Sequence, residues 1–278
     1  MPSRLSGKVA LISGVARGQG RSHAVALAAE GADIIGFDIC GPVQAQGAPP
    51  ASGADLAETV RLVEKLDRRI VTAELDVRDH DAVEHFVAEA AAELGGLDIV
   101  VANAGINGPG VTVAETRHED WRSVIDTNLT GTYNTVKAAL PPLLAGSRGG
   151  SITLVSSSLA LRPGLHFGAY TTTKHGIVGL METLALELGG QSVRVNSVHP
   201  TGVRTDLFLN PATYRLFRPD LERPTLDDAM LAFHDLNVLP IPWIEADDVS
   251  NLVVFLATDE ARYITGASIP VNAGHHIH

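Results

Sequence analysis

The fold is decided by residues 8–38, which read KVALISGVARGQGRSHAVALAAEGADIIGFD. An apolar run enters a turn containing Gly14, Gly18 and Gly20, an alanine-rich stretch follows, and a second apolar run ends at Asp38. A glycine triplet alone is a weak signal. Because this one follows a predicted strand, opens a predicted helix and precedes an acid by about twenty residues, it indicates a strand-helix-strand unit that binds a dinucleotide.

The glycines suit a phosphate-binding turn. Without Cβ atoms the backbone can turn tightly, and a pyrophosphate can approach the free N–H groups and the positive end of the helix that begins near Gly18. Asp38 can accept hydrogen bonds from both hydroxyls of the adenine ribose and would repel a phosphate there. We therefore predict NAD rather than NADP. Arg17 could instead pair with a 2′-phosphate, and a glycine turn without any ligand is the alternative interpretation.

Composition narrows the class of protein. The net charge of −11 makes nucleic acid or an anionic membrane surface a poor partner. The single cysteine, Cys40, fits a reducing compartment. No apolar run has the length of a signal peptide or a membrane span, and the histidines near the C-terminus lack partners at metal-ligand spacing. We expect a cytoplasmic protein without a metal.

The remaining chain alternates predicted strands and helices, which is typical of a parallel sheet. We predict a single α/β domain over residues 1–278, a Rossmann-type, doubly wound, parallel seven-stranded sheet with helices on both faces. The uncharged residues 41–53 are interpreted as an insertion, and the proline-interrupted residues from about 203 to 245 as a substrate lid. The later strands are expected at 70–75, 97–102, 151–155, 193–198 and 268–271, and the helices at 54–69, 79–94, 115–145 with a bend near Pro141, 169–188 and 246–258.

Ligand-facing residues are expected where parallel strands end, at the carboxyl edge of the sheet. Asp76 could accept a hydrogen bond from the adenine amino group, or could cap the following helix. The predicted cofactor-binding residues from these strand ends and from the glycine turn are Gly14, Arg17, Gly18, Gln19, Gly20, Asp38, Ile39, Asp76, Val77, Asn103, Ala104 and Gly105.

Tyr170 and Lys174 are four residues apart at the start of a predicted helix, so their side chains share one face. A nearby ammonium group stabilises a phenolate and should lower the pKa of Tyr170 toward the range useful for an acid or base. Ser157, at the end of a predicted strand, can reach the same point. Two hydroxyls converging on one substrate oxygen suit carbonyl reduction or alcohol oxidation. A surface Tyr and Lys pair without function is the alternative.

Together these motifs resemble the short-chain dehydrogenase/reductase family over essentially the whole chain. The resemblance implies that Tyr170 is the general acid/base, that Ser157 positions the substrate oxygen and that Lys174 binds the nicotinamide ribose and tunes Tyr170. Asn128, which lies among apolar helical neighbours, would hold a water of the proton relay. Tyr170 and Lys174 would then also contact the cofactor, and Pro200, Gly202, Val203 and Thr205 match the stretch that contacts the nicotinamide carboxamide.

A narrower resemblance concerns residues 17–23, 37–40 and the insertion 41–53. They are similar to the mycofactocin-associated subfamily, which includes carveol dehydrogenase-like enzymes. That resemblance implies an NAD that does not exchange and passes its hydride to the redox carrier mycofactocin. An uncharged insertion after the ribose-binding acid is placed to cover the adenosine half of the cofactor. A surface loop without function is the alternative.

The leading hypothesis is an NAD-dependent oxidoreductase that interconverts a hydrophobic secondary alcohol and its ketone. The alternatives are an ordinary enzyme with dissociable NAD(P), such as a 3-oxoacyl or steroid-type reductase, an enoyl reductase, and a non-catalytic NAD-binding sensor. The resemblance disfavours enoyl reduction, because the family's enoyl reductases usually space the Tyr and Lys more widely. The apolar residues after position 174 exceed what one core-facing stripe requires, so we expect a partner helix there, and the family resemblance implies that a homotetramer supplies it. The apolar side chains expected in the lid are Leu207, Phe208, Leu216, Phe217, Met230, Leu231, Phe233 and Trp243.

Overall fold

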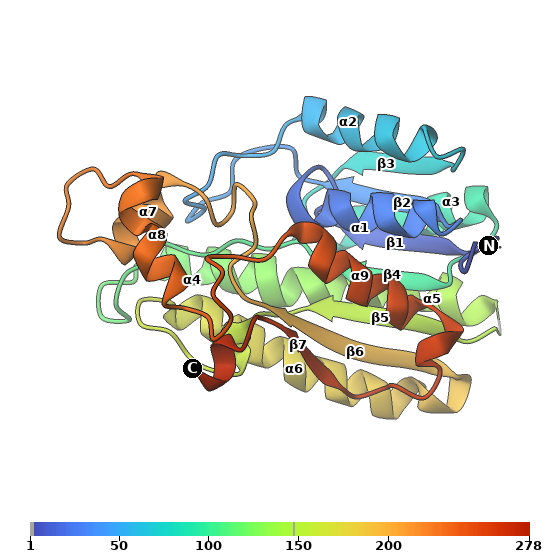
Figure 1. Ribbon diagram of the computed structural model, residues 1–278. Coiled ribbons are helices and arrows are strands. Elements are labelled where there is room, and N and C mark those ends of the chain that lie inside the picture. The colour runs from blue at the N-terminus through green and yellow to red at the C-terminus, as the bar shows by residue number, and fades with distance from the viewer. Residues whose placement is uncertain (1–2, 147) are drawn as a thin grey trace.

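The computed structural model describes residues 3–146 and 148–278. Its centre is a seven-stranded sheet in the order β3-β2-β1-β4-β5-β6-β7, in which every neighbouring pair is parallel (Figure 1). The predicted Rossmann-type fold is therefore confirmed. The strands are β1 (Val9–Ser13), β2 (Asp33–Asp38), β3 (Ile70–Glu74), β4 (Ile99–Ala102), β5 (Gly150–Val155), β6 (Val193–Pro200) and β7 (Ser268–Val271).

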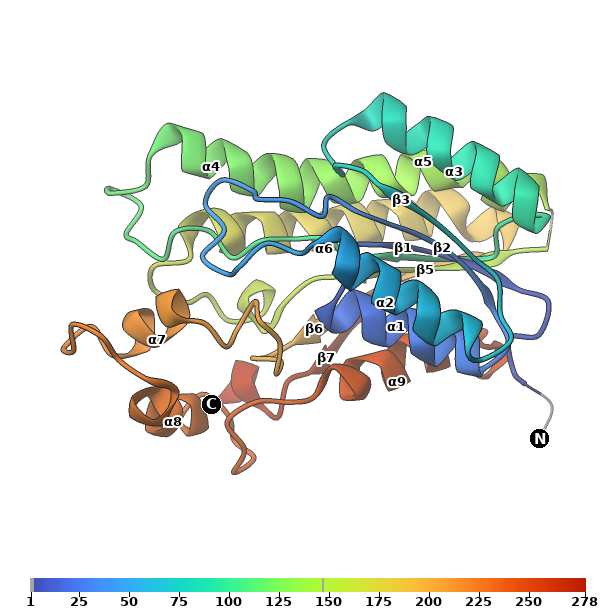
Figure 2. The same cartoon turned by 90° about the horizontal axis from the view of Figure 1, so that it is seen from above.

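Helices cover both faces of this sheet, as Figure 2 shows from above. One layer contains α3, α5 and α6, and the other contains α1, α2 and α9. The helices are α1 (Gly18–Ala29), α2 (Gly53–Glu64), α3 (His80–Leu94), α4 (His118–Ile125), α5 (Gly131–Ala145), α6 (Gly168–Leu188), α7 (Pro211–Phe217), α8 (Leu226–His234) and α9 (Ala246–Ala257).

The strands read as continuous apolar runs because both of their faces are buried. Along β1, Val9 and Leu11 belong to the core beneath α3, α5 and α6, whereas Ala10 and Ile12 belong to the core beneath α1, α2 and α9. Successive side chains of a strand point to opposite faces, so one run of sequence supplies two hydrophobic cores.

The order of the strands creates a crevice at one place on the carboxyl edge. The chain runs outward from β1 through β2 to β3, then returns to place β4 on the other side of β1. Connections on the two sides of such a switch point leave in opposite directions, so a ligand-sized gap opens between the strand ends. Gly14 follows β1 and Asn103 follows β4, which brings the glycine turn and the Asn103 segment together there.

The segment predicted as one long helix over 115–145 is helical but is divided into three parts, and the predicted bend near Pro141 is wrong. The segment consists of α4, a π-helical turn η1 (Asp126–Thr130) and α5. Pro141 and Pro142 lie inside α5 and do not interrupt it. The irregularity lies instead at Asn128, where a π-helical turn shifts the register of the side chains, as such turns often do at functional sites.

Other helix boundaries differ from the predictions because local caps override periodicity. The helix predicted over 54–69 is α2, which begins one residue earlier, after a capping box of Ser52 and Asp55, and ends at Glu64. Asp79 is the N-cap of α3, with its carboxylate accepting from the Ala82 N–H at 3.1 Å. Short polar side chains satisfy the free N–H groups at a helix start, so they fix where it begins.

The segment between β6 and α9, which contains α7 and α8, lies beyond the carboxyl edge of the sheet (Figure 1). There α7 and α8 pack through aromatic rings, and the Phe233 centroid lies 4.7 Å from that of Phe208 and 5.0 Å from that of Phe217. Over the residues that the structure describes, no helix is long and apolar enough to cross a membrane.

Thr59 of α2 ties this helix to the glycine turn and provides a test of the fold. Its buried hydroxyl is 3.1 and 3.0 Å from the carbonyl oxygens of Val15 and Ala16, and accepts from Arg21 Nε at 3.0 Å. Thr59→Val keeps the shape but leaves buried polar groups unpaired, so we expect a loss of about 1–3 kcal/mol in the free energy of unfolding by urea.

The matched control is Thr183→Val on α6, where the hydroxyl bonds the Gly179 carbonyl in an exposed position. We expect it to change the free energy of unfolding by less than about 0.5 kcal/mol. Equal losses for both variants would contradict the proposed role of Thr59.

Candidate functional site

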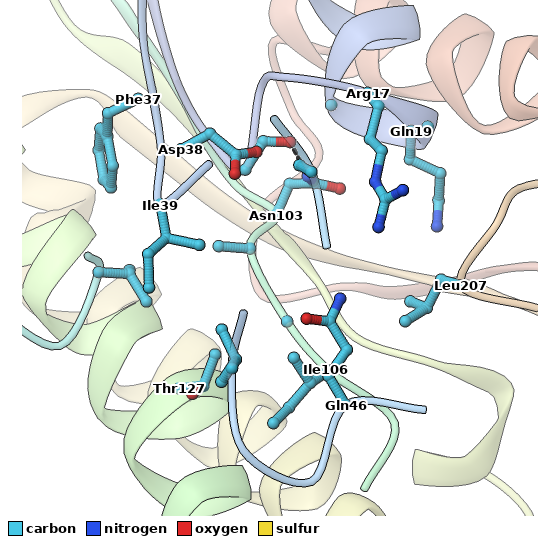
Figure 3. Close-up of a pocket in the computed structure, with 18 of the residues that line it drawn as sticks. Arg17, Gln19, Phe37, Asp38, Ile39, Gln46, Asn103, Ile106, Thr127 and Leu207 are labelled. Atoms are coloured by element: carbon cyan, nitrogen blue, oxygen red, sulfur yellow. Dashed lines mark hydrogen bonds between the residues drawn. The ribbon is translucent and has the colours of Figure 1, made fainter. Parts of the chain in front are cut away.

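A cavity of about 150 Å³ lies where β1, β2 and β4 end, at the crevice of the sheet (Figure 3). Most residues predicted to bind the cofactor line it, which shows that the fold brings them together. These are Gly14, Arg17, Gly18, Gln19, Gly20, Asp38, Ile39, Asp76, Val77, Asn103, Ala104, Gly105 and Thr205.

The glycine turn is tight enough to require glycine. Gly14 has a φ of +72°, and a Cβ there would lie 2.9 Å from the Cα of Ala104. Gly18 has a φ of +55°, and a Cβ on Gly20 would overlap the Gly14 carbonyl oxygen. Left-handed φ and close backbone contacts both exclude larger residues. The turn thus leaves the start of α1 open toward the cavity, as a phosphate group requires.

Asp38 is held in place by backbone N–H groups of the glycine turn and of the segment that follows β2. Its Oδ2 accepts from the Ala16 N–H at 3.0 Å, and its Oδ1 accepts from the Cys40 N–H at 3.1 Å. A carboxylate has about four acceptor sites, so both oxygens can accept further bonds. The carboxylate is therefore preorganised at the end of β2, where a ribose diol would need it.

Arg17 joins three segments of the chain. Its guanidinium forms an ion pair with Asp206, with Nη1 and Oδ2 2.9 Å apart, and its Nη2 donates to the Pro49 carbonyl. Pro49 belongs to residues 41–53 and Asp206 follows β6. Figure 3 shows Arg17 and Gln19 beside the cavity, near Leu207. The guanidinium that could have paired with a 2′-phosphate is thus bonded to other groups of the chain.

Two polar atoms at this cavity have no hydrogen-bond partner among the described residues. They are Gln19 Oε1 and Thr127 Oγ1, and both are buried. Unpaired buried polar groups are costly, so their presence at a cavity indicates a polar ligand. With the glycine turn, the open helix start and Asp38, these atoms fit a dinucleotide.

Asp76 lines the cavity but already has a partner. Its Oδ1 accepts from the Arg78 N–H at 2.9 Å, and the two side chains form an ion pair. Burial alone would raise the pKa of Asp76, yet the hydrogen bonds from Arg78 outweigh it and hold the pKa below its ordinary value. The alternative that Asp76 caps the next helix is wrong, because Asp79 does so.

A second cavity, of about 610 Å³, adjoins the first, since Gln19, Thr205 and Leu207 line both. Its volume lies in the range of about 300–1,000 Å³ that is typical of ligand sites. Ser157 and Tyr170 line it, together with the predicted residues Pro200, Gly202, Val203 and Thr205 and the apolar residues Leu207, Phe208, Leu216 and Phe217. Met230, Leu231, Phe233 and Trp243, also expected in the lid, are not among its lining residues.

Tyr170 and Lys174 lie on one face of α6, as predicted. Lys174 Nζ is 5.4 Å from the centre of the Tyr170 ring and donates to the Val155 carbonyl at 2.8 Å. Burial lowers the pKa of Lys174 to about 8. The expected lowering of the Tyr170 pKa is wrong for the protein alone, because burial raises that pKa, and the Ser157 hydroxyl, acting in the opposite direction, does not offset it.

Asn128 is fully buried in the π-helical turn and lines neither cavity. Its Oδ1 accepts from the Ile106 N–H and its Nδ2 donates to the Ile106 carbonyl, both at 2.8 Å. The side chain thereby fixes the segment after β4 that carries Gly105. A role in a water relay stays a prediction.

Four residues of the insertion 41–53 line the first cavity, and the predicted site did not include them residue by residue. The insertion has no charged side chain that would indicate binding at one position, and contacts far apart in sequence decide which of its residues face the cavity. Thr127, Asp206 and Leu207 were missed for the same reason. The additional lining residues are Phe37, Gly41, Val43, Gln46, Ala51, Leu75, Ile106, Thr127, Asp206 and Leu207.

The bonds of Asn128 predict a local effect on stability. Asn128→Ala leaves the N–H and the carbonyl of Ile106 buried without partners, so we expect unfolding by urea to become about 2–5 kcal/mol easier. Hydrogen exchange at the Ile106 amide should also accelerate. As a control, Asn107→Ala removes only a bond to the Leu207 carbonyl and should leave exchange at the Ile106 amide unchanged. If exchange at Ile106 were also unchanged in Asn128→Ala, the role of Asn128 in fixing this segment would be refuted.

Comparison with known proteins agrees with this geometry. A family model described as "Enoyl-(Acyl carrier protein) reductase" matches residues 14–276. The chain is 55% identical over 275 residues, 99% of both chains, to a protein of Mycolicibacterium smegmatis named as a short-chain type dehydrogenase/reductase. It is 50% identical to the (−)-trans-carveol dehydrogenase of Rhodococcus erythropolis over 272 residues, 98% of both chains.

Solved structures are similar over the whole chain. The crystal structure of carveol dehydrogenase from Mycobacterium avium in complex with NAD has a TM-score of 0.98 and 52% identity, covering 99% of this chain and 100% of that one. The short-chain dehydrogenase from Mycobacterium paratuberculosis bound to NAD has a TM-score of 0.91 and 44% identity, with the same coverage.

Proposed function

Because the chain belongs to the short-chain dehydrogenase/reductase family, we propose that this NAD-dependent alcohol oxidoreductase interconverts a hydrophobic secondary alcohol and its ketone. The observation that carries this proposal is the contact between the two cavities. A dinucleotide in the first would direct its nicotinamide end toward the second, where Ser157 and Tyr170 lie together.

The residues of the second cavity have complementary roles in the proposed reaction. Bound NAD supplies the hydride acceptor. Tyr170 removes the hydroxyl proton of the alcohol, and Ser157 donates a hydrogen bond that positions the same oxygen. Lys174, buried next to the Tyr170 ring, contributes a positive charge that stabilises the phenolate form of Tyr170, which accepts this proton and becomes the phenol. Asn128 acts indirectly by fixing Ile106 and the neighbouring Gly105.

The substrate we propose is an alicyclic alcohol without charge. Leu207, Phe208, Leu216 and Phe217 give the cavity an apolar wall, and apolar walls bind by excluding water. The Rhodococcus relative is named for carveol. A steroid alcohol is the second candidate, because a relative from Mycobacterium tuberculosis, 36% identical over 274 residues, is named 3-alpha-(or 20-beta)-hydroxysteroid dehydrogenase, and the cavity is large.

We further propose that NAD is retained, because residues 41–53 are anchored across its cavity. Ser123 of α4 donates to the Gln44 carbonyl at 2.7 Å, and Gln44 Nε2 donates to Asp120 at 3.3 Å. Val43 and Ala45 pack against the buried side chains of Ile106, Val124 and Ala169. The insertion is thus part of the packed structure on the far side of the crevice.

The position of the insertion supports slow exchange. Gly41, Val43, Gln46 and Ala51 line the first cavity together with the glycine turn. Outward movement of the insertion and of the segment after β6 would require breaking the bonds of Arg17 to Pro49 and Asp206. A cofactor that stays bound must be reoxidised in place, and we propose mycofactocin as the carrier, as the resemblance of residues 17–23 and 37–53 implies.

Association into a homotetramer is a further part of the proposal. Most of the apolar side chains of α6 pack in the hydrophobic core, including those of Ile177, Met181 and Leu184. Leu186 remains 87% exposed on that helix. Light scattering should give the mass of four chains, and the mass of one chain would refute the association.

Replacing Tyr170 tests the chemistry. Tyr170→Phe removes the hydroxyl but keeps the ring over Lys174, so we expect turnover to fall by about 10²–10⁴-fold or more, while NAD remains bound. Oxidation of (−)-trans-carveol, cyclohexanols and hydroxysteroids is followed with a dye as electron acceptor. Tyr133→Phe, at a half-exposed position on α5, is the matched control. Near-normal turnover in Tyr170→Phe would rule out the proposed acid/base role.

Retention of NAD is tested by dialysis of the purified protein, followed by denaturation and quantification of the released nucleotide by mass spectrometry. We expect about one NAD per chain, because in this proposal release requires residues 41–53 and the segment after β6 to move outward. Asp206→Asn breaks the ion pair with Arg17 and should speed release. Glu245→Gln breaks the exposed pair with Arg204, 2.8 Å apart, and should not. A protein that is empty after dialysis would contradict retention.

A further inference from the structure

His199 lies at the end of β6 and is completely buried. Its Nδ1 is 3.0 Å from the carbonyl oxygen of Ser157, and its Nε2 is 2.9 Å from Ser197 Oγ. It lines neither cavity, so it touches no ligand. We propose that His199 is a positioning residue, which fixes the backbone of Ser157 so that the serine hydroxyl meets the substrate oxygen.

The partners of the ring determine its tautomer. A carbonyl oxygen can only accept, so Nδ1 carries the proton that bonds Ser157. Burial lowers the pKa of His199, the hydrogen bond to Ser157 acts against it, and the positive charge of Lys174 lowers the pKa further, so the net lowering favours the neutral ring. Nε2 is then an acceptor, and Ser197 donates to it.

The orientation of this bond extends to the next strand. The hydroxyl of Ser197 has one proton, which it gives to His199. Ser268 of β7 lies 3.2 Å away, Oγ to Oγ, and must therefore be the donor to Ser197. The bonds run in one direction, from Ser268 through Ser197 and His199 to Ser157, and bonds aligned in this way polarise and strengthen one another.

The result is a serine whose carbonyl oxygen is fully used, while its hydroxyl keeps a proton to donate. The Ser157 carbonyl accepts from His199 and from the Ala160 N–H at 3.0 Å, so both of its lone pairs are occupied. Ser157 Oγ accepts from the Leu159 N–H at 3.1 Å. The backbone and the direction of the side chain are thereby fixed, while the proton can be donated into the second cavity. This inference rests on the proposed role of Ser157.

Two amide substitutions distinguish the roles of the two ring nitrogens of His199. In His199→Asn the amide nitrogen takes the position of Nδ1 and can still donate to Ser157. In His199→Gln it reaches the position of Nε2, and the bond to Ser157 is lost. A misplacement of about 1 Å in an active site can cost about 10²-fold in rate, so we expect kcat to fall about 10–100-fold in His199→Gln and less than about 3-fold in His199→Asn. The KM of the alcohol and the NAD content per chain should not change.

Controls distinguish this inference from the proposed function. Ser157→Ala should lose nearly all turnover, and wild-type turnover in that variant would refute the catalytic role of Ser157 itself. If Ser157→Ala is inactive while His199→Gln keeps the wild-type kcat, only the inference about His199 fails. Ser268→Ala, at the far end of the bonds, should retain kcat within about 3-fold, because the bond to Ser157 remains.

The tautomer can be measured in the wild-type protein. Nitrogen NMR of the wild-type protein with isotopically labelled histidine should show His199 neutral and protonated at Nδ1, with its signal assigned by its absence in His199→Asn. A ring protonated at Nε2 or at both nitrogens would overturn the proposal, as would equal losses of kcat in the Asn and Gln variants.

Discussion

The structure depends on the close approach of two backbone segments at the ends of β1 and β4. Gly14 packs so tightly against Ala104 that no side chain fits between them, and the Asn103 side chain donates to the Ser13 and Gly14 carbonyls at 3.0 and 3.2 Å. This contact places the glycine turn, Asp38 and the segment held by Asn128 around one crevice. The first cavity exists because these elements meet there.

Burial shapes the electrostatics of the neighbouring site. Lys174 is a buried residue of α6, and the loss of water around it disfavours its charged form. Burial disfavours the phenolate of Tyr170 in the same way. A lysine bonded to the Val155 carbonyl is held beneath the tyrosine ring rather than free in solvent. The proton affinity of Tyr170 therefore depends on its buried surroundings, and a bound ligand that changes the charge near Tyr170 and Lys174 would change it.

The cover of the crevice comes from segments that are distant in sequence. Residues 41–53 reach α4 through Gln44, and a Cβ on Gly47 would lie 2.9 Å from Ala212 of α7, so the insertion also lies against the layer that borders the second cavity. Arg17 connects this insertion to the segment after β6. The insertion, the glycine turn and the segment after β6 are thus joined by direct contacts at the border of both cavities.

The sequence by itself determined the sheet, its two helical layers, and the glycine turn, Asp38 and Asn103 at the crevice. Apolar runs of strand length, glycines before a helix and Tyr170 one turn before Lys174 are local patterns, and local patterns follow from backbone geometry. Only the tertiary structure decided that Arg17 bonds Asp206 and Pro49, that the register shifts at Asn128 and that His199 holds Ser157. These contacts join residues far apart in the chain, and their energies depend on burial and orientation, which no local pattern encodes.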